Sequence, residues 1–144
     1  MLFRSLAKEG VRVSFIGERH RFSAKIQKGF ERLEARTRAH SHFHLVIALS
    51  YGGRAEIIQA AERLFRSRRP VTEKNFEQFL WTNHIPDPDL VIRTGGELRT
   101  SNFLPWQSVY SEWVFTGTLW PAFSRREFKA IINEFSRRER RHGR

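Results

Sequence analysis

DPDLVIRTGGELRTSNFLPWQSVYSEWVFTGTLWPAF, residues 87–123, carries the clearest strand and loop signals in the chain. It holds two short apolar runs, Leu90–Ile92 and Trp113–Phe115, which are typical of buried strands in an α/β sheet. Ser101 lies between them and is a favoured N-cap residue, so we expect a helix to begin near Phe103. The stretch therefore predicts a strand, a loop, a helix and a second strand, in that order.

The loop after the first predicted strand carries groups that bind anions. Arg93 and Arg99 flank the pair Gly95-Gly96, where the backbone can approach a ligand closely. Arginines make bidentate contacts with phosphate, and free N–H groups at a helix start attract it. Glu112 stands just before the second strand, and a carboxylate close to a diphosphate commonly holds Mg²⁺. Each feature taken singly is more often an ordinary surface feature, but their order favours an anion site.

The composition indicates a single globular domain with anionic partners. The chain has 144 residues, of which 40% are hydrophobic, and carries a net charge of +11. This suits one domain with a real core, and it favours diphosphates, nucleic acid or an anionic membrane surface as partners. No apolar run reaches the ~20 residues of a membrane span, and no signal peptide is recognisable. The absence of cysteine excludes disulfides and fits a cytoplasmic location.

Strand and helix patterns alternate along the rest of the chain. Strands are predicted over Val11–Ile16 and residues 43–50, and further helices after Ser23, Thr72 and Ser124 and after the Gly52-Gly53 turn. The side chains expected to face the core share helical spacing; they are Ile57, Ala61, Leu64 and Phe65 in one helix, and Phe128, Ile131, Ile132 and Phe135 in the last. Residues 2–9 are expected to end another helix. The alternation predicts one α/β domain over residues 1–144, with a mostly parallel sheet flanked by helices.

Two further clusters have more than one interpretation. His40, His42 and His44 alternate, which suggests a metal site, but a solvated loop leading into a strand is favoured because no carboxylate accompanies them. Arginine is concentrated at the C-terminal end of the chain, where a solvated helix end and an anion-binding tail are about equally expected.

These motifs resemble the C-terminal signature of the cis-prenyltransferases, also called isoprenyl transferases or undecaprenyl diphosphate synthases. The matching segments are PDLVIRTGGE, R-x-SNF, WQ-x-x-Y-x-E and LWP, all within residues 87–123. The resemblance extends to GVRVSFIGERHRF, where Glu18 replaces the usual Asp, and to SYGGR, where Ser50 replaces the usual Asn. It ends on the terminal Arg141-x-Gly143, so it runs from the first predicted strand to the tail.

The resemblance implies a fold, a reaction and a set of site residues. The fold would be an incomplete undecaprenyl diphosphate synthase-like domain. The reaction would be cis-polyprenyl diphosphate synthesis, which condenses isopentenyl diphosphate onto an allylic diphosphate such as farnesyl diphosphate. Mg²⁺ is the implied cofactor, and Glu112 is its implied ligand. The implied substrate-binding residues are Arg93, Arg99, Thr100, Ser101, Arg141 and Gly143, and the last two are associated with reaching a partner chain's diphosphate site.

One motif of the family is missing, and its absence leaves alternatives open. The family's catalytic Asp belongs to a D-G-N-G-R motif, whereas the only aspartates of this sequence are Asp87 and Asp89. We therefore expect either a piece of a full enzyme or a chain that needs a partner, as a homodimer or beside a different chain. The alternative function is a non-catalytic subunit that donates its Arg-x-Gly tail to a catalytic chain. Peripheral membrane contact through the lipid product is also implied. Specific nucleic-acid binding is not expected, because no recognition motif is visible.

Overall fold

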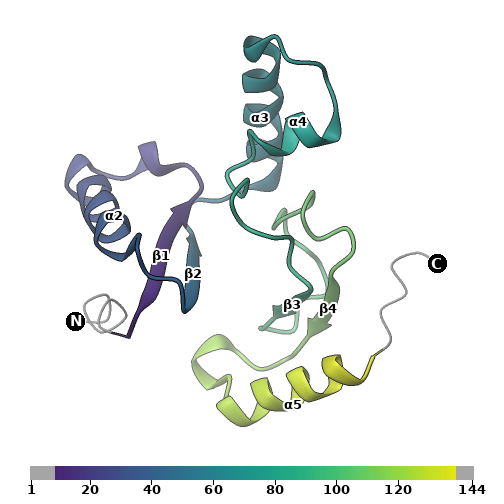
Figure 1. The fold of residues 1–144 in the computed structure, drawn as a ribbon. Coiled ribbons are helices and arrows are strands. Elements are labelled where there is room, and N and C mark those ends of the chain that lie inside the picture. Colours follow the sequence, from purple (N-terminus) through teal and green to yellow (C-terminus); the bar gives the residue numbers. More distant parts are fainter. Residues whose placement is uncertain (1–8, 139–144) are drawn as a thin grey trace. The chain divides into compact units, whose positions relative to one another are not determined.

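Four β-strands in two parallel pairs form the framework of the protein in a computed structural model, which describes residues 9–138 (Figure 1). β1 pairs with β2, and β3 pairs with β4. The predicted α/β class, with parallel strands flanked by helices, is confirmed. The chain divides into two units, residues 1–84 and 85–144, while one domain over residues 1–144 stays a prediction. Residues 2–8 of the expected N-terminal helix lie outside the described residues.

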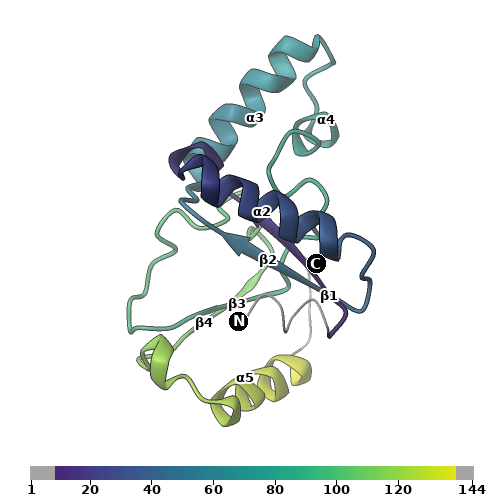
Figure 2. The ribbon, with the colours of Figure 1, turned by 90° about the vertical axis from the view of Figure 1, so that its left-hand side faces the viewer.

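The first unit is built on β1 (Val11–Ile16) and β2 (Phe43–Ala48), which are joined by α2 (Ala24–Thr37). The register places Val11 opposite Phe43 and Ile16 opposite Ala48. Figure 2 shows α2 lying across this pair of strands, as a parallel crossover requires. Phe30 and Leu33 of α2 pack against the buried side chains of β1, and the rings of Phe15 and Phe30 are stacked with centroids 4.4 Å apart. Phe30 and Leu33 thus lie on the inward face of α2.

The outer edge of β1 is closed by two side chains of α2. Thr37 Oγ1 accepts a hydrogen bond from the N–H of Val13 at 3.0 Å, and Glu34 Oε1 accepts one from the N–H of Phe15 at 2.9 Å. Arg19 fixes the Glu34 carboxylate through two contacts of 2.8 and 3.2 Å. Because buried backbone donors must be paired, α2 performs at this edge the task of a neighbouring strand.

Two further helices complete the first unit, α3 (Gly53–Ser67) and α4 (Glu73–Glu77). The predicted inward face of α3 is confirmed at Leu64 but wrong at Ala61 and Phe65, which are exposed, Phe65 to 84%. The buried positions of α3 are Gly53, Glu56, Ala60 and Leu64. The face is rotated because Glu56 points inward, where its carboxylate accepts hydrogen bonds from Tyr51 Oη at 2.5 Å and from the N–H of Thr82 at 3.3 Å.

The second unit is built on β3 (Leu90–Arg93) and β4 (Glu112–Phe115), followed by the 3₁₀ turn η2 (Trp120–Ala122) and α5 (Arg125–Arg137). Two contacts fix the direction of α5. Near its start, Thr116 Oγ1 donates to Glu127 Oε1 at 2.6 Å. Just after its end, Arg138 Nη1 donates to Glu112 Oε2 at 2.9 Å. Since Glu112 opens β4 and Thr116 follows its end, α5 runs back along β4 on the face that carries these two residues.

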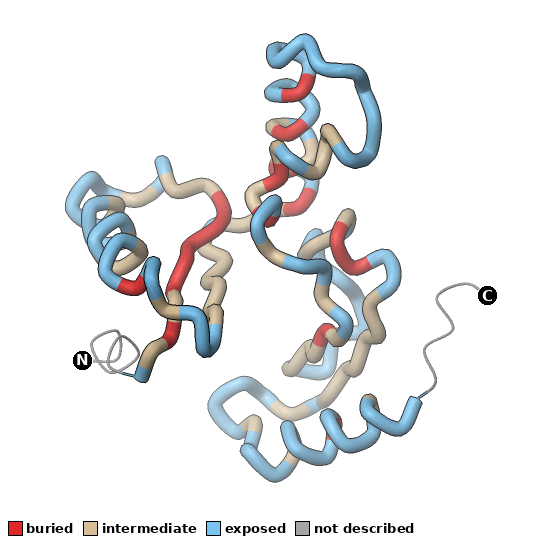
Figure 3. The backbone as a smooth tube through the Cα atoms, viewed as in Figure 1, coloured by how far each residue is buried: buried red, intermediate tan, exposed pale blue. Residues whose placement is uncertain are grey.

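Two predictions about the second unit are wrong. Residues 101–110 form a series of turns and not the expected helix. Ser101, Asn102 and Leu104 have φ values of 49°, 64° and 48°, a left-handed conformation that cannot continue a right-handed helix. On α5 only Ile131 is buried, while Phe128 is 45% and Ile132 38% exposed. The expected core stripe of α5 is therefore only partly covered (Figure 3).

The helices that are described are short and rich in charge. Within residues 9–138, none combines the length and the hydrophobicity that crossing a bilayer requires.

Thr37 offers a direct test of the closed edge. Replacing it in Thr37→Val removes the hydroxyl but keeps the shape, and it leaves the buried N–H of Val13 without its acceptor. We expect the free energy of unfolding in urea to fall by about 1–3 kcal/mol. Thr37→Ser retains the hydroxyl and is the matched control, with a smaller expected loss. Equal losses in both variants would contradict the role of the hydrogen bond.

Candidate functional site

Arg93 stands at the end of β3 and is held in place by the loop that follows. Its Nη1 donates to Ser101 Oγ at 2.8 Å and also to the backbone carbonyl of Arg99. The guanidinium is thus fixed against two residues six and eight positions further along the chain. These contacts bring together three of the predicted substrate-binding residues at the carboxyl end of a parallel strand, where α/β proteins bind ligands.

The Gly95-Gly96 pair prolongs the pairing of the two strands. Gly95 N–H donates to the carbonyl of Thr118 at 3.0 Å, and Gly96 N–H donates to that of Thr116 at 2.9 Å. Both glycines have positive φ, 97° and 79°, which side chains rarely tolerate. Because these N–H groups are already bonded within the chain, they do not form the anion-binding cradle that the sequence suggests. The anion-binding capacity of the loop rests on its side chains.

Arg99 and Thr100 are exposed beside this loop. The Arg99 guanidinium pairs with Glu97 at 2.7 Å, and such an exposed pair is weak enough to exchange one anion for another. The carbonyl of Thr100 accepts from the N–H of Phe103 at 3.1 Å. Because residues 101–110 form turns and not a helix, the helix start expected to attract phosphate is missing here.

Glu112 lies away from this group. It is opposite Leu90 in the β3–β4 register, whereas Arg93 is opposite Phe115. Three residues separate these positions, which corresponds to about 10 Å along a strand and to opposite faces of the sheet. Stacking of Trp113 on Phe115, with ring centroids 5.8 Å apart, shows the same alternation. The structure therefore brings the Arg93 guanidinium to Ser101 and to the backbone of Arg99, and it leaves Glu112 on the other face of the two strands.

Arg138, which contacts Glu112, belongs to none of the motifs that indicated the site. Arg138 also contacts Glu134 on the preceding turn of α5, and hydrogen bonds from Arg138 to Glu134 and to Glu112 raise the pKa of Arg138. The i, i+4 spacing from Glu134 was the available signal. The remaining predicted site residues, Arg141 and Gly143, lie outside the described residues.

The fit of a metal ion rests on Glu112 alone. Among residues 9–138, no three His, Cys, Asp or Glu side chains are grouped closely enough to hold a metal. Mg²⁺ is commonly bound by only one or two carboxylates together with substrate phosphates. A single carboxylate at Glu112 fits such a site only if the phosphates and any further ligand come from other molecules or from other parts of the chain.

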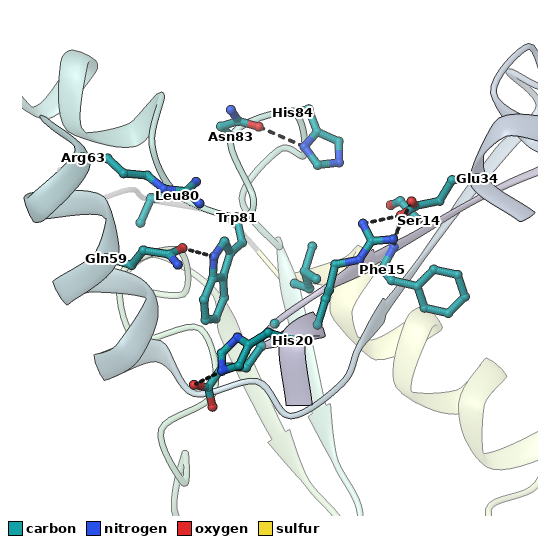
Figure 4. A pocket seen from close by; sticks show the side chains of 14 residues that line it. Ser14, Phe15, His20, Glu34, Gln59, Arg63, Leu80, Trp81, Asn83 and His84 are labelled. Atoms are coloured by element: carbon teal, nitrogen blue, oxygen red, sulfur yellow. Dashed lines mark hydrogen bonds and ion pairs between the residues drawn. The ribbon is translucent and has the colours of Figure 1, made fainter. Parts of the chain in front are cut away.

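The first unit contains a cavity of about 450 Å³ where β1 ends. Gly17 makes the turn there with φ +109°, and a Cβ atom would lie 2.1 Å from the carbonyl oxygen of Leu49. Figure 4 shows Arg63, Trp81 and His84 on its walls, with the Trp81 indole donating to Gln59. None of the predicted site residues lines this cavity, and its basic and acidic side chains are mixed.

His44 and His84 share one environment in the first unit. Their ring centroids are 6.0 Å apart, and His44 Nε2 lies 2.8 Å from Ser14 Oγ. Burial, the neighbouring Arg12 and the other histidine lower the pKa of His44, and burial and Arg12 lower that of His84. Both imidazoles are therefore kept neutral in the folded protein more readily than in the unfolded chain.

Comparison with known proteins identifies the family. A protein-family model described as "Putative undecaprenyl diphosphate synthase" matches residues 2–143. The chain belongs to this family. It is 43% identical over 143 residues to an isoprenyl transferase of Thermotoga maritima, a match that covers 96% of this chain and 61% of the relative. The prenyltransferase resemblance stated from the motifs is thus confirmed.

Solved structures agree with this assignment. The fold is similar to that of a "probable undecaprenyl diphosphate synthase" from Campylobacter jejuni, with a TM-score of 0.90 and 38% identity, covering 99% of this chain and 67% of that one. It is also similar to lavandulyl diphosphate synthase from Lavandula x intermedia in complex with dimethylallyl diphosphate, with a TM-score of 0.91, 32% identity and the same coverages. The chain spans only 61% and 55% of the first two curated relatives that it matches.

The two histidines generate a prediction on acid stability. Because the folded state lowers the pKa of both, the unfolded chain binds more protons below about pH 6.5, the ordinary value of the group. The free energy of unfolding is therefore expected to be independent of these groups above that pH and to decrease as the pH falls below it. Urea titrations of His44→Gln/His84→Gln between pH 5 and 7.5 should show a flatter profile than the parent. An unchanged slope would contradict this assignment.

Proposed function

We propose that this chain carries the isopentenyl diphosphate half of a cis-polyprenyl diphosphate synthase site. In the reaction, an allylic diphosphate such as farnesyl diphosphate loses pyrophosphate, and its allylic carbon bonds to the terminal alkene carbon of isopentenyl diphosphate. A proton leaves C2 of isopentenyl diphosphate, and the new double bond of the product forms there. The observation that carries the proposal is the orientation of Arg93 by Ser101 and by the carbonyl of Arg99 at the carboxyl end of β3. Membership of the family supports the reaction class.

Each of the three residues has a part in holding the diphosphate. Arg93 is half-buried and already oriented, so it presents its guanidinium at little entropic cost. Arg99 is exposed, and a diphosphate would replace Glu97 as its partner. Ser101 offers a hydroxyl beside Arg93. Two guanidinium groups and one hydroxyl match the charge and the acceptors of a diphosphate.

Glu112 is the carboxylate that we assign to Mg²⁺. The ion, when bound, offsets negative charge on the diphosphate oxygens. Glu112 and Arg93 lie on opposite faces of the β3–β4 pair, so within one copy they do not face the same diphosphate. Glu112 is held by Arg138, which keeps its carboxylate oriented until a metal competes for it. We infer that the further ligands of the complete site come from the substrate phosphates, from another molecule or from parts of the chain outside residues 9–138.

The second candidate function is that of a partner subunit without its own catalytic Asp. It is favoured by the separation of Glu112 from Arg93 on the two faces of the β3–β4 pair. In this form the tail with Arg141 and Gly143 would complete the diphosphate site of another chain. A homodimer or a heteromeric complex satisfies the same requirement.

Diphosphate binding tests the proposed half-site directly. Isothermal titration of isopentenyl diphosphate should show Arg93→Gln and Ser101→Ala binding about ten- to a hundred-fold more weakly than the parent, because each loses charge-assisted hydrogen bonds. Arg66→Gln is the matched control, since Arg66 is an exposed arginine in the other unit and forms an ion pair with Glu62 at 2.5 Å. Equal affinity of all variants for isopentenyl diphosphate would contradict the assignment of the site.

Chain elongation tests how much of the reaction this chain performs. With farnesyl diphosphate, isopentenyl diphosphate and Mg²⁺, we expect the chain alone to give little or no cis-polyprenyl product by mass spectrometry. Activity should appear when a family member that holds the D-G-N-G-R motif but lacks its own Arg-x-Gly tail is added. Rescue that survives Arg141→Ala would contradict the partner function, and ordinary turnover by the chain alone would contradict the half-site.

A further inference from the structure

An apolar surface of the second unit remains exposed next to the start of α5. Leu119 is 67%, Trp120 75% and Phe128 45% exposed. The rings are linked, with Trp120 stacked on Phe123 at 6.1 Å and Phe123 meeting Phe128 edge-on at 6.5 Å between centroids. Phe123 is half-buried and contacts both Trp120 and Phe128. These contacts hold the two exposed rings against the rest of the second unit.

Three cations adjoin these rings. Arg125, Arg126 and Lys129 line a shallow groove of about 550 Å³ on α5, together with Ala130 and Asn133. All three are exposed, and within residues 9–138 no ion pair neutralises any of them. We call the combined area of Leu119, Trp120, Phe128 and these three cations the Trp120 surface.

The helix arranges charge and apolar side chains on adjoining faces. At 100° per residue, Phe128 and Ile132 border Arg125 and Lys129, whereas Glu127 and Glu134 lie on the far side. Helix stability does not explain the cations, because arginines in the first turn oppose the positive end of the helix dipole. At these positions the cations destabilise the isolated helix slightly, but they would interact favourably with an anion bound from outside.

We propose that the Trp120 surface docks the protein onto an anionic lipid bilayer. Tryptophan is favoured at the boundary between headgroups and acyl chains, and bordering apolar and basic faces are the pattern of helices that lie in that boundary. The three cations would contact lipid phosphates while Leu119, Trp120 and Phe128 enter the apolar layer. A single-stranded nucleic acid also suits cations beside aromatic rings, but the aliphatic Leu119 and Ile132 offer it no stacking partner.

The first experiment measures binding of the whole chain to vesicles. Co-sedimentation with phosphatidylglycerol vesicles should be strong, and with pure phosphatidylcholine vesicles weak. Arg125→Gln/Arg126→Gln/Lys129→Gln should weaken the binding by roughly two orders of magnitude, because each surface cation contributes about five-fold. Lys25→Gln/Lys28→Gln/Arg32→Gln on α2 is the matched control, since it removes the same charge from exposed positions of the other unit. Equal weakening by both triple variants would overturn the proposal.

The second experiment follows the tryptophan itself. Brominated phosphatidylglycerol should quench part of the tryptophan emission, and Trp120→Phe should remove most of that quenching while retaining an aromatic side chain. Quenching that persists in Trp120→Phe would place the contact elsewhere and overturn the proposal. Sedimentation velocity of the same variants, alone and with an oligonucleotide, tests whether the surface binds a second protein chain or a nucleic acid. Loss of self-association or of oligonucleotide binding, with vesicle binding unchanged, would assign the surface to a protein or to a nucleic acid instead. Neither readout requires catalytic activity, so failure of the proposed reaction leaves this test intact.

Discussion

The register of β3 against β4 determines where the candidate site residues of the second unit point. Leu90 is opposite Glu112 and Arg93 is opposite Phe115. Side chains of a strand alternate between faces, so a difference of three residues places the carboxylate and the guanidinium on opposite sides. The same alternation puts Thr116 on the face of Glu112, where both contact α5. A shift of one residue would exchange every one of these positions.

Because of this register, the candidate diphosphate-binding residues and the candidate metal ligand lie apart, although they are close in the sequence. Arg93, Ser101 and the Arg99 backbone form a cluster that is preorganised by hydrogen bonds within the chain. Glu112, in contrast, is held by a helix on the far face through Arg138. Linear proximity suggested a common pocket, but the two groups are fixed to different supports. An active site assembled from them must therefore draw on more than one copy or on more of the chain than is described.

Strand positions and cap residues were predictable because their signals are local. All four strands lie where the apolar runs indicated, and Thr72 and Ser124 cap their helices through hydrogen bonds to Asn75 and Glu127. The grouping of Arg93 with Ser101 was also predictable from the order of motifs. The direction of Glu112 was not, because it depends on the register of a strand 22 positions earlier in the chain.

The errors have equally specific causes. Ser101 is of a residue type that commonly caps helices. However, Ser101 and Leu104 have φ values of 49° and 48°, so the backbone is left-handed there and a right-handed helix does not form. In α3 the carboxylate of Glu56 is buried at a position where an apolar side chain would be expected. It is tolerated there because Tyr51 and Thr82 donate hydrogen bonds to it. Such compensation between distant residues leaves no periodic signal in the sequence.

The side chains that cap β1 give its sheet a single direction of growth. Val13 and Phe15 donate their outward N–H groups to Thr37 and Glu34, so an approaching strand would find those donors taken and a helix in the way. Within the part of the chain that the structure describes, β2 pairs with β1 alone. Any strand that enlarges this sheet, from whichever polypeptide it comes, must therefore join it beside β2.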